Sequence, residues 1–430
     1  MTDTIQYILR FMVGEQLPDD INRLIGYTSD ATCYADYKVV IIPSEFFDEG
    51  VYGTARTNPV VPVQIIEGIP FLFGTPEIER VGETLVVHAD LVASAFFLLS
   101  RYDEVIHRAK RDPFGRFPGC ESIANRAGFI DRPVVDEYGK LIRKWLQDSG
   151  VSLKNVAPHL SRINLTHDVD APFHCRTWRN VARNVFSGQS LFCAMRAKYG
   201  RLENDLYYTF PRILKQNNKL QEEVGEKLCQ TILFFKAGGK TKNDKPRYDL
   251  YGKDIRALFT LCREQGAAIG LHSSFQAGME PACIASEKKK LEDAYGQEIR
   301  HNRHHFLSSR EPEDMEMLEQ AGITDDYTMG YADITGFRLG TSFPVRYINP
   351  VTRRLTSLTL HPLVIMDGTL FNSNYMNLTA EQAEDHCKQL IHNIRQVNGE
   401  LTLLWHNTVF AKHTGGYLRT LYSNLLRIVK

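Results

Sequence analysis

The sequence predicts an α/β protein in which a smaller α+β domain, residues 1–155, precedes a larger domain, residues 160–430, built on a mainly parallel sheet. From residue 163 on, short apolar runs alternate with amphipathic helical stretches, which is the pattern of repeated βαβ units. Before residue 150 the strand and helix signals are mixed, and a polar, proline-containing segment at 152–162 separates the two patterns. The alternation does not by itself distinguish an open sheet from a barrel.

The first region contains the following expected elements in order. Residues 37–47 read as a buried strand, 51–74 as short strands and turns, and 84–89 as another strand. Asp90 stands where it can cap a helix that continues towards residue 110. A turn-rich loop at 111–122, with Arg111 and Arg116, follows; it is either a plain surface loop or the border of a substrate cleft. A last helix ends at Gly150.

The second region has clearer signals. Strands are predicted at 163–170, 230–240, 267–274 and 401–408, and helices at 255–266, 313–322 and 379–399. Gly266 can supply the left-handed residue that ends the first of these helices. Thr379 and Gln382 form a capping box at the start of the last one, and Gly399 ends it.

Composition excludes several classes of protein. Hydrophobic residues make up 43% and charged residues 24% of the 430, values normal for a globular chain with a sizeable core. Lys+Arg and Asp+Glu are balanced at 51 each, which disfavours a nucleic-acid partner. No run of about 18 apolar residues predicts a transmembrane segment. The eight scattered cysteines form no CxxC pair and no basic leader precedes an apolar core, so we expect reduced thiols in a cytoplasmic protein.

Titratable side chains recur where the predicted strands of the second region end. The run 163–170 ends in Asp168 and Asp170, the next-but-one strand ends in His272, and the last strand leads into His406. In parallel α/β folds the carboxyl ends of the strands converge on one face, where active sites lie. Packing alone does not explain this recurrence, so we expect a functional site there.

The acid pair favours a cation. Asp168 and Asp170 are two residues apart on a strand, so their side chains point the same way and repel unless a cation lies near them. Taken singly, the residues have ordinary explanations, since acids are common in loops and helix caps and strand histidines are usually structural. Acids and histidine together suit a divalent metal, most simply Zn²⁺, with one position left for water.

The stretch 301–305 adds further candidates. It holds His301, Arg303, His304 and His305, and it lies between two predicted helices. It is either a hydrated basic turn or, if the preceding residues end a strand, a contributor to the same face.

In this order the motifs resemble those of the polysaccharide deacetylase family, the carbohydrate esterases that share the NodB homology domain. Residues 166–170 (THDVD) are similar to the D-x-D form of its first motif, and 272–275 (HSSF) to the start of H-[ST]-x-x-H. Residues 303–306 (RHHF) are similar to R-x-P-[FY], and 404–406 (LWH) to the last motif. Segments 330–333 and 336–338 match a GYAD…GFR stretch of bacterial members with an uncharacterised N-terminal domain. The resemblance covers about residues 160–430.

The resemblance implies a distorted (β/α) barrel and a metal-dependent removal of acetyl groups from N-acetylated sugars. By it, Asp168 is the general base, Asp170 and His272 are metal ligands, and His406 protonates the departing amine. Arg303 is expected to orient Asp168, and Asp326 or Asp333 to orient His406. Arg338 is expected to contact substrate or an acid, with a surface ion pair as the alternative.

One departure from the family concerns the metal. Gln276 stands where the family has its second histidine, and a carboxamide is a poor ligand for zinc. A histidine, His305, stands where the family has proline. We therefore predict that His305 completes the site with Asp170 and His272; His304 is the alternative ligand.

Other functions remain open at this level. The same centre could hydrolyse another amide, cyclic amides included, or an ester. If no histidine replaces Gln276, the chain is instead a catalytically decayed carbohydrate-binding protein. The sequence selects neither the acceptor sugar, nor the metal, nor an oligomeric state.

Overall fold

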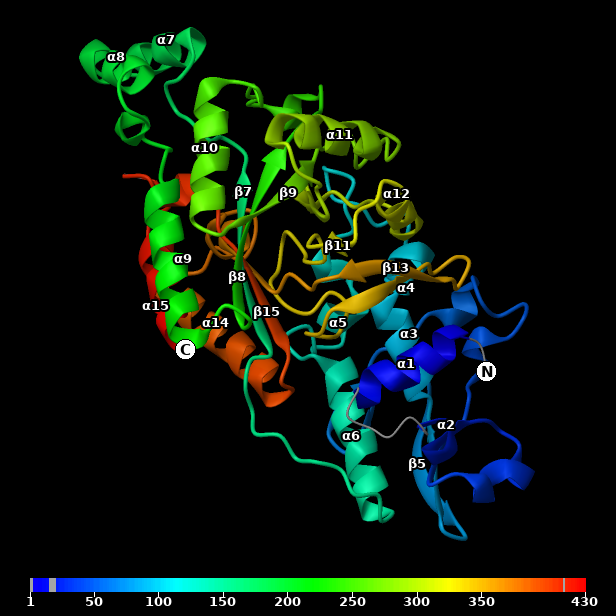
Figure 1. The fold of residues 1–430 in the computed structure, drawn as a ribbon. Helices are drawn as coiled ribbons and strands as arrows, with labels where there is room; N and C mark the ends of the chain where they lie inside the picture. Colours follow the sequence, from blue (N-terminus) through cyan, green and yellow to red (C-terminus); the bar gives the residue numbers. More distant parts are fainter. Residues whose placement is uncertain (1–2, 15–20, 413) are drawn as a thin grey trace.

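The computed structural model describes residues 3–14, 21–412 and 414–430. It has a four-stranded sheet in the N-terminal part, a nine-stranded sheet in the C-terminal part and a separate two-stranded ribbon. Figure 1 shows the two parts side by side, the N-terminal one in blue and cyan and the C-terminal one in green to red. The predicted fold class is confirmed: a smaller α+β region precedes a larger α/β region with a barrel-type sheet.

The N-terminal sheet has the order β1-β2-β6-β5, in which β1, β2 and β6 are parallel and β5 is antiparallel to β6. Its strands are β1 (Ile25–Tyr27), β2 (Val39–Ile41), β5 (Gly74–Val81) and β6 (Thr84–Ala89), and the ribbon pairs β3 (Gln64–Ile66) with β4 (Ile69–Phe71). The helices are α1 (Asp3–Val13), α2 (Ile21–Leu24), α3 (Leu91–Leu99), α4 (Tyr102–Ile106), α5 (Ile123–Arg126) and α6 (Val134–Asp148).

The predicted helix cap at Asp90 is confirmed, and the predicted helix after it is confirmed in part. The carboxylate of Asp90 accepts a hydrogen bond from the backbone N–H of Ala93, at 2.9 Å, and so caps α3. The helix does not continue unbroken to residue 110, because Arg101 takes the left-handed conformation (φ +64°) and separates α3 from α4. The sequence carries no glycine or proline there that would have signalled the break.

The C-terminal sheet has the order β12-β13-β11-β10-β9-β8-β7-β15-β14, and every neighbouring pair is parallel except β12 with β13. Its strands are β7 (Arg162–Val169), β8 (Cys229–Lys236), β9 (Ala268–Ser273), β10 (His301–His304), β11 (Asp325–Asp326), β12 (Val345–Ile348), β13 (Leu355–Leu360), β14 (Ile365–Met366) and β15 (Glu400–Leu404). The parallel strands run side by side from β7 to β11, as expected for successive βαβ units.

The helices of this part are α7 (Trp178–Phe186), α8 (Leu191–Tyr199), α9 (Phe210–Val224), α10 (Lys253–Glu264), α11 (Cys283–Tyr295), α12 (Glu316–Gln320), α13 (Asp367–Phe371), α14 (Ala380–Gln396) and α15 (Leu418–Ile428). Figure 1 shows α9, α10, α14 and α15 around the outside of the sheet. Gly266 follows α10 with φ +68°, and Thr379 and Gln382 form the capping box of α14, both as predicted.

Strand lengths differ from the prediction in two places. The predicted strand 401–408 already ends at Leu404, and His406 instead precedes a short 3-10 helix, Asn407–Phe410. The stretch 301–305, for which a hydrated basic turn was one prediction, is largely a strand, β10, and the last four of its five residues are buried. Histidine and arginine have no strong strand preference, so the strand is imposed by its neighbours β9 and β11.

The two parts pack directly against each other. A single cluster of buried apolar side chains draws on residues from Ile8 to Leu360, and residues 151–160 between the parts form no helix or strand. The carboxylate of Glu104, in the N-terminal part, pairs with both Arg101 and, from the C-terminal part, Arg338. The predicted division at 155–160 into separate domains therefore stays a prediction.

Removing the charge of Glu104 is expected to destabilise the fold. The side chains of Glu104, Arg101 and Arg338 are almost fully buried. Burial raises the pKa of Glu104, but the two guanidiniums outweigh it and lower that pKa to about 2. In Glu104→Gln two buried cations face a neutral amide, which should cost about 3–5 kcal/mol in the free energy of unfolding by urea.

A matched control is the exposed pair of Arg56 with Glu45. Glu45→Gln should change the free energy of unfolding by less than about 1 kcal/mol, because solvent screens such pairs. Equal unfolding midpoints for the two variants would show that Glu104 does not hold the two parts together.

The ionisation of His361 is expected to make the free energy of unfolding depend on pH. Its ring nitrogens lie 2.7 Å from Glu400 Oε1 and 3.0 Å from Asp325 Oδ1, and its ring stacks on Tyr327. Burial lowers the pKa of His361, but the two carboxylates raise it overall to about 9. Because the folded-state pKa exceeds the unfolded value, the stabilisation is complete below about pH 6.5 and is lost as pH rises through about 9.

The measurement is the free energy of unfolding of the wild type minus that of His361→Gln, from pH 6 to 10. We expect a difference on the order of 3 kcal/mol at the acid end that shrinks through the stated window. A difference that grows with pH would mean that His361 is not held as a cation.

Candidate metal centre

The predicted side chains come from strands that are neighbours in the sheet. β7 supplies Asp168 and leads into Asp170, β9 supplies His272, and β10 supplies Arg303. His305 follows β10, and His406 follows β15 by two residues. Since β15, β7, β8, β9 and β10 are adjacent and parallel, their carboxyl ends meet at one edge of the sheet.

Three of these residues form a compact cluster. Asp170, His272 and His305 each offer one ligand atom, and these atoms all lie within 4.8 Å of one another. Asp170 Oδ1 is 3.2 Å from Nε2 of His272 and 3.2 Å from Nε2 of His305. Such spacing suits atoms arranged around one cation at bond lengths of about 2.0–2.2 Å.

The polar atoms of the cluster that lack a hydrogen-bond partner are suited to bind a divalent metal. Asp170 Oδ1 and His272 Nε2 are buried and have no hydrogen-bond partner among the described residues. Each such atom costs about 1–3 kcal/mol unless water or an ion satisfies it. Two imidazole nitrogens and one carboxylate oxygen are ligands that Zn²⁺ prefers. In a centre of this kind Asp170, His272 and His305 would hold the ion.

Outer contacts orient the two imidazoles. Nδ1 of His272 lies 2.8 Å from the backbone O of Arg303, to which it donates, so Nε2 is the free nitrogen facing Asp170. Nδ1 of His305 faces Asp244 Oδ1 at 3.9 Å. Burial lowers the pKa of His305, but Asp170 and Asp244 together raise it. Burial raises the pKa of Asp170, yet His305 and His272 bring it well below its usual value.

Asp168 is held by a buried arginine. Arg303 Nη1 donates to Asp168 Oδ1 at 3.1 Å and to the hydroxyl of Thr166 at 2.8 Å. Its Nε donates to the backbone O of Tyr327, and the guanidinium lies over the ring of Phe234. The other carboxylate oxygen, Oδ2, is 3.5 Å from Nε2 of His272. Asp168 is therefore a fixed, paired carboxylate next to the cluster.

His406 is oriented by Asp367, a residue that the sequence analysis did not identify. Asp367 Oδ1 lies 2.8 Å from His406 Nδ1, and Oδ2 accepts the backbone N–H of His406 at 2.7 Å. Burial lowers the pKa of His406, but Asp367 raises it to about 10. The opposite nitrogen, Nε2, is 3.7 Å from Asp170 Oδ2. His406 thus points a protonated ring at the cluster.

The residues expected to orient His406 lie in other contacts. Asp326 accepts hydrogen bonds from Asn302 and Thr328, and Asp333 accepts the backbone N–H groups of Gly119 and Cys120. The expectation was wrong, because the residue that orients His406 is Asp367. A signal existed, because the apolar run 363–366 ends in Asp367 in the same way as the runs before Asp168 and His406.

Arg338 contacts an acid, Glu104, but the pair is buried rather than at the surface, and its Nη1 donates to the backbone O of Gly330. It therefore joins the two parts of the protein.

His304, the alternative ligand, faces Asn302 and Thr328 instead of Asp170. Gln276 accepts from the backbone N–H of Lys240 and donates to Glu280, outside the cluster.

The N-terminal part reaches the edge of this centre through its 111–122 loop. Arg116 is nearly buried, and its Nη1 donates to the backbone O of Phe306, the residue after His305, at 2.7 Å. Its Nη2 donates to the hydroxyl of Tyr375 at 3.0 Å. The loop was expected to be either a plain surface loop or the border of a substrate cleft, and these contacts support the second interpretation.

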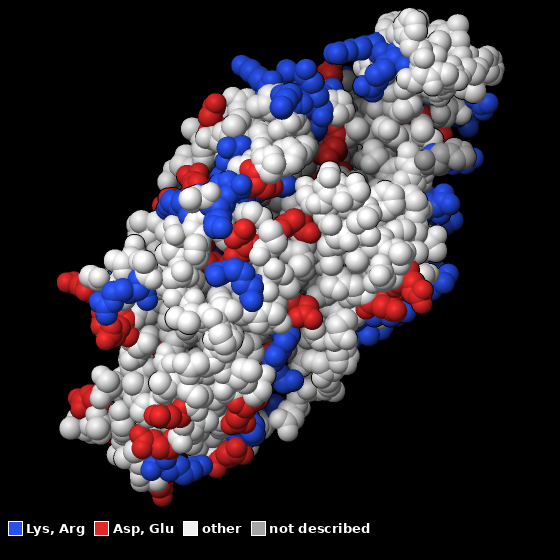
Figure 2. All heavy atoms as spheres, turned by 180° about the vertical axis from the view of Figure 1, so that it is seen from behind, with Lys and Arg blue, Asp and Glu red and all other residues white. Residues whose placement is uncertain are grey.

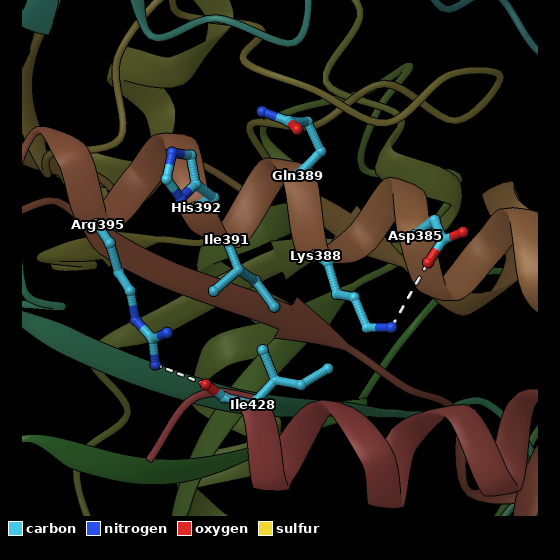
Figure 3. Close-up of a pocket in the computed structure, with 7 residues that line it drawn as sticks. All are labelled: Asp385, Lys388, Gln389, Ile391, His392, Arg395 and Ile428. Atoms are coloured by element: carbon cyan, nitrogen blue, oxygen red, sulfur yellow. Dashed lines mark hydrogen bonds and ion pairs between the residues drawn. The ribbon is translucent and has the colours of Figure 1, made fainter.

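A separate surface hollow lies between α14 and α15 and has no part in this centre. Figure 3 shows its lining side chains, which come from one face of α14 and from Ile428 near the end of α15. Lys388 pairs with Asp385 there, and Arg395 donates to the backbone O of Ile428. None of the predicted site residues lines it.

Fold and site together define an α/β protein with a candidate divalent-metal centre at the carboxyl edge of its larger sheet. Comparison with family models matches residues 1–150 to a family of unknown function, DUF7033. Comparison with curated proteins gives no match. Among the described residues, no helix is both long and apolar enough to cross a membrane.

The chain is distantly similar to several solved structures over about two thirds of its length. One is described as a candidate polysaccharide deacetylase from Mycobacterium smegmatis: 13% identity, 64% of this chain and 89% of that chain, TM-score 0.39. A second is a CE4 family pseudoenzyme from Bacillus anthracis: 11% identity, 66% of each chain, TM-score 0.32. A mutant of that pseudoenzyme with restored enzymatic activity has 12% identity, covers 66% of this chain and 69% of its own, and has a TM-score of 0.32. Likeness this distant carries no functional assignment.

Proposed function

We propose that this protein is a metal-dependent hydrolase that removes an acetyl group from an N-acetylated sugar or glycan. The observation that carries the proposal is the cluster of Asp170, His272 and His305, whose ligand atoms lie within 4.8 Å of one another. Beside it stand an arginine-paired carboxylate, Asp168, and a protonated imidazole, His406. A cation site flanked by one base and one acid is what hydrolysis of an amide requires.

Asp168 is suited to take a proton. Arg303 fixes one of its oxygens, and the other, Oδ2, faces His272 Nε2 and the cluster. A carboxylate held in this way can accept the proton of a water molecule as that water attacks the acetamide carbonyl. A divalent cation held by the cluster would supply Lewis acidity, which makes a water nucleophilic near neutral pH and polarises the carbonyl.

His406 is suited to deliver a proton. An amine leaves poorly unless its nitrogen is protonated, so the reaction needs an acid on the side of the leaving group. Asp367 keeps the pKa of His406 near 10, and the ring therefore carries its proton at neutral pH. Asp367 also fixes the ring so that Nε2, the donating atom, is directed at the cluster.

The sugar part of the proposal rests on the motif resemblance at residues 166–170, 272–275, 303–306 and 404–406. Another amide or an ester would use the same base, acid and cation. A decayed carbohydrate-binding protein is favoured by the absence of a family histidine at Gln276, which lies outside the cluster. The position of His305 supports a hydrolase instead, because His305 supplies a second imidazole from the position directly after β10.

Metal content and acetate release together test the proposal. Purified full-length protein is stripped with a chelator, reloaded with Zn²⁺, and given N-acetylglucosamine oligomers while released acetate is measured. We expect about one metal ion per chain and acetate release that disappears on stripping and returns on reloading. Protein that binds no metal at micromolar zinc overturns the proposal. Protein that binds metal but releases no acetate from the sugar, while it cleaves other amides or esters, restricts it to the alternative substrates.

A further inference from the structure

A helical hairpin projects from the C-terminal part between β7 and α9. It consists of α7 (Trp178–Phe186) and α8 (Leu191–Tyr199). Figure 1 shows the two helices at the upper left, beyond α10 and away from the sheet. Its interior is small: the buried apolar residues are Cys175, Val181, Ala194 and Ala197. The hairpin therefore keeps few of its large apolar side chains inside.

The large apolar side chains point outwards. Phe186 is 91% exposed, which is the largest value among the big apolar residues that the structure describes, and Phe192 is 74% exposed. On α8, at 100° per residue, Leu191, Phe192 and Tyr199 share a sector of about 100°, while Ala194 and Ala197 occupy another side. This reverses the usual amphipathic arrangement, in which the large apolar side chains are buried.

The charge on the hairpin has one sign. Residues 171–202 contain no Asp or Glu but six basic residues, although the whole chain is balanced at 51 of each sign. The six are Arg176, Arg179, Arg183, Arg196, Lys198 and Arg201. Arg176 lies 3.7 Å from Asp254, while Arg179, Arg183, Arg196 and Arg201 are exposed and pair with no described carboxylate. In Figure 2 this end, at the upper right, is white with blue beside it.

An exposed aromatic pair encloses the sixth basic residue. Nζ of Lys198 lies 5.0 Å from the ring centre of Trp178 and 5.1 Å from that of Tyr199, and the two rings are 5.9 Å apart. Trp and Tyr with a neighbouring Lys are the side chains that proteins place at the boundary between lipid and water. Basic residues beside exposed Phe and Leu complete the composition of an interfacial helix.

The base of the hairpin is fixed to the edge of the metal centre. Asp205 accepts the backbone N–H groups of His174 and Cys175, at 2.7 and 2.8 Å. Nδ2 of Asn407 donates to the backbone O of Ala171 and of Tyr207, and so joins both ends of the hairpin. Ala171 follows Asp170 and Asn407 follows His406. Whatever the hairpin binds is therefore held close to the centre.

We propose that the α7–α8 hairpin docks this protein onto the surface of an anionic lipid bilayer, with Phe186, Leu191 and Phe192 inserted among the lipids and the arginines at the headgroups. Charge complementarity selects this occupant, because residues 171–202 carry six basic and no acidic residues, and an anionic membrane attracts every basic residue near it. The inference goes beyond the proposed hydrolysis and does not depend on it.

Vesicle sedimentation with full-length protein tests the proposal. We expect co-sedimentation with vesicles of phosphatidylcholine and phosphatidylglycerol, and little with phosphatidylcholine alone. The double variant Arg179→Glu/Arg183→Glu should lower the partition coefficient at least about 25-fold, from about fivefold for each charge removed. Phe186→Ser/Phe192→Ser should also release the protein.

Matched controls use exposed residues of the N-terminal part. Arg80→Glu/Lys154→Glu removes the same charge, and Val60→Ser/Ile65→Ser removes exposed apolar side chains, and both should leave binding unchanged. Equal sedimentation with both kinds of vesicle, or equal loss in hairpin and control variants, overturns the proposal. The proposal is also overturned if the wild type does not bind vesicles but forms a dimer, while Phe186→Ser/Phe192→Ser protein is monomeric. The hairpin would then bind a second copy of the chain.

Discussion

Replacing His305 with alanine is expected to remove the metal from the protein. His305 contributes one of the three ligand atoms of the cluster, and without it only Asp170 and His272 remain. Contacts that merely orient a ligand are worth about 10–100-fold in metal affinity, so loss of the ligand itself should weaken binding by more than about 100-fold. The measurement is zinc affinity by competition with a chelating dye, together with the thermal midpoint of the metal-free variant.

Gln276→Ala is the matched control, because the sequence motif assigns the second ligand to that position. Gln276 contacts Lys240 and Glu280 outside the cluster, and so its removal should leave zinc affinity unchanged. If instead Gln276→Ala loses the metal and His305→Ala keeps it, the centre is not built from the cluster of Asp170, His272 and His305.

Replacing Asp168 with asparagine is expected to abolish most of the hydrolysis while the metal stays bound. The amide keeps the shape of the side chain and its contact with Arg303 but cannot accept a proton from water. General-base catalysis contributes about 10²–10⁴-fold, so acetate release should fall by that factor. Metal content per chain should remain that of the wild type, since Asp168 is not one of the three clustered residues.

Asp333→Asn serves as the comparison for this experiment. Asp333 caps the backbone N–H groups of Gly119 and Cys120, so it should leave acetate release near the wild-type rate. Asp168→Asn protein that folds, binds metal and hydrolyses at the wild-type rate would remove Asp168 from the reaction. A rate lost together with the metal would instead make Asp168 a ligand.

Local signals in the sequence determined much of the fold. The strands now seen as β7, β8 and β9, the cap at Asp90, the left-handed Gly266 and the capping box at Thr379 were all predicted. These features depend on residues within one turn or one strand, so a short window of sequence contains their cause. The short strand β11 and the break at Arg101 have no such local cause and were missed. The strand β14 was missed too, although the apolar run 363–366 marks it in the sequence.

The sequence by itself also determined that acids and imidazoles follow apolar strands, since strand ends are visible as the points where apolar runs stop. Only the tertiary structure decided which of them meet. His304 and His305 are adjacent in sequence, yet the first faces Asn302 and Thr328 and the second faces Asp170. His304 is the last residue of β10 and His305 is the first residue of the 3-10 helix His305–Leu307, so the two side chains leave the backbone in different directions. Likewise, the placement of β14 beside β15 brings Asp367 to His406. Strand order depends on packing over the whole sheet, and no single segment of sequence contains it.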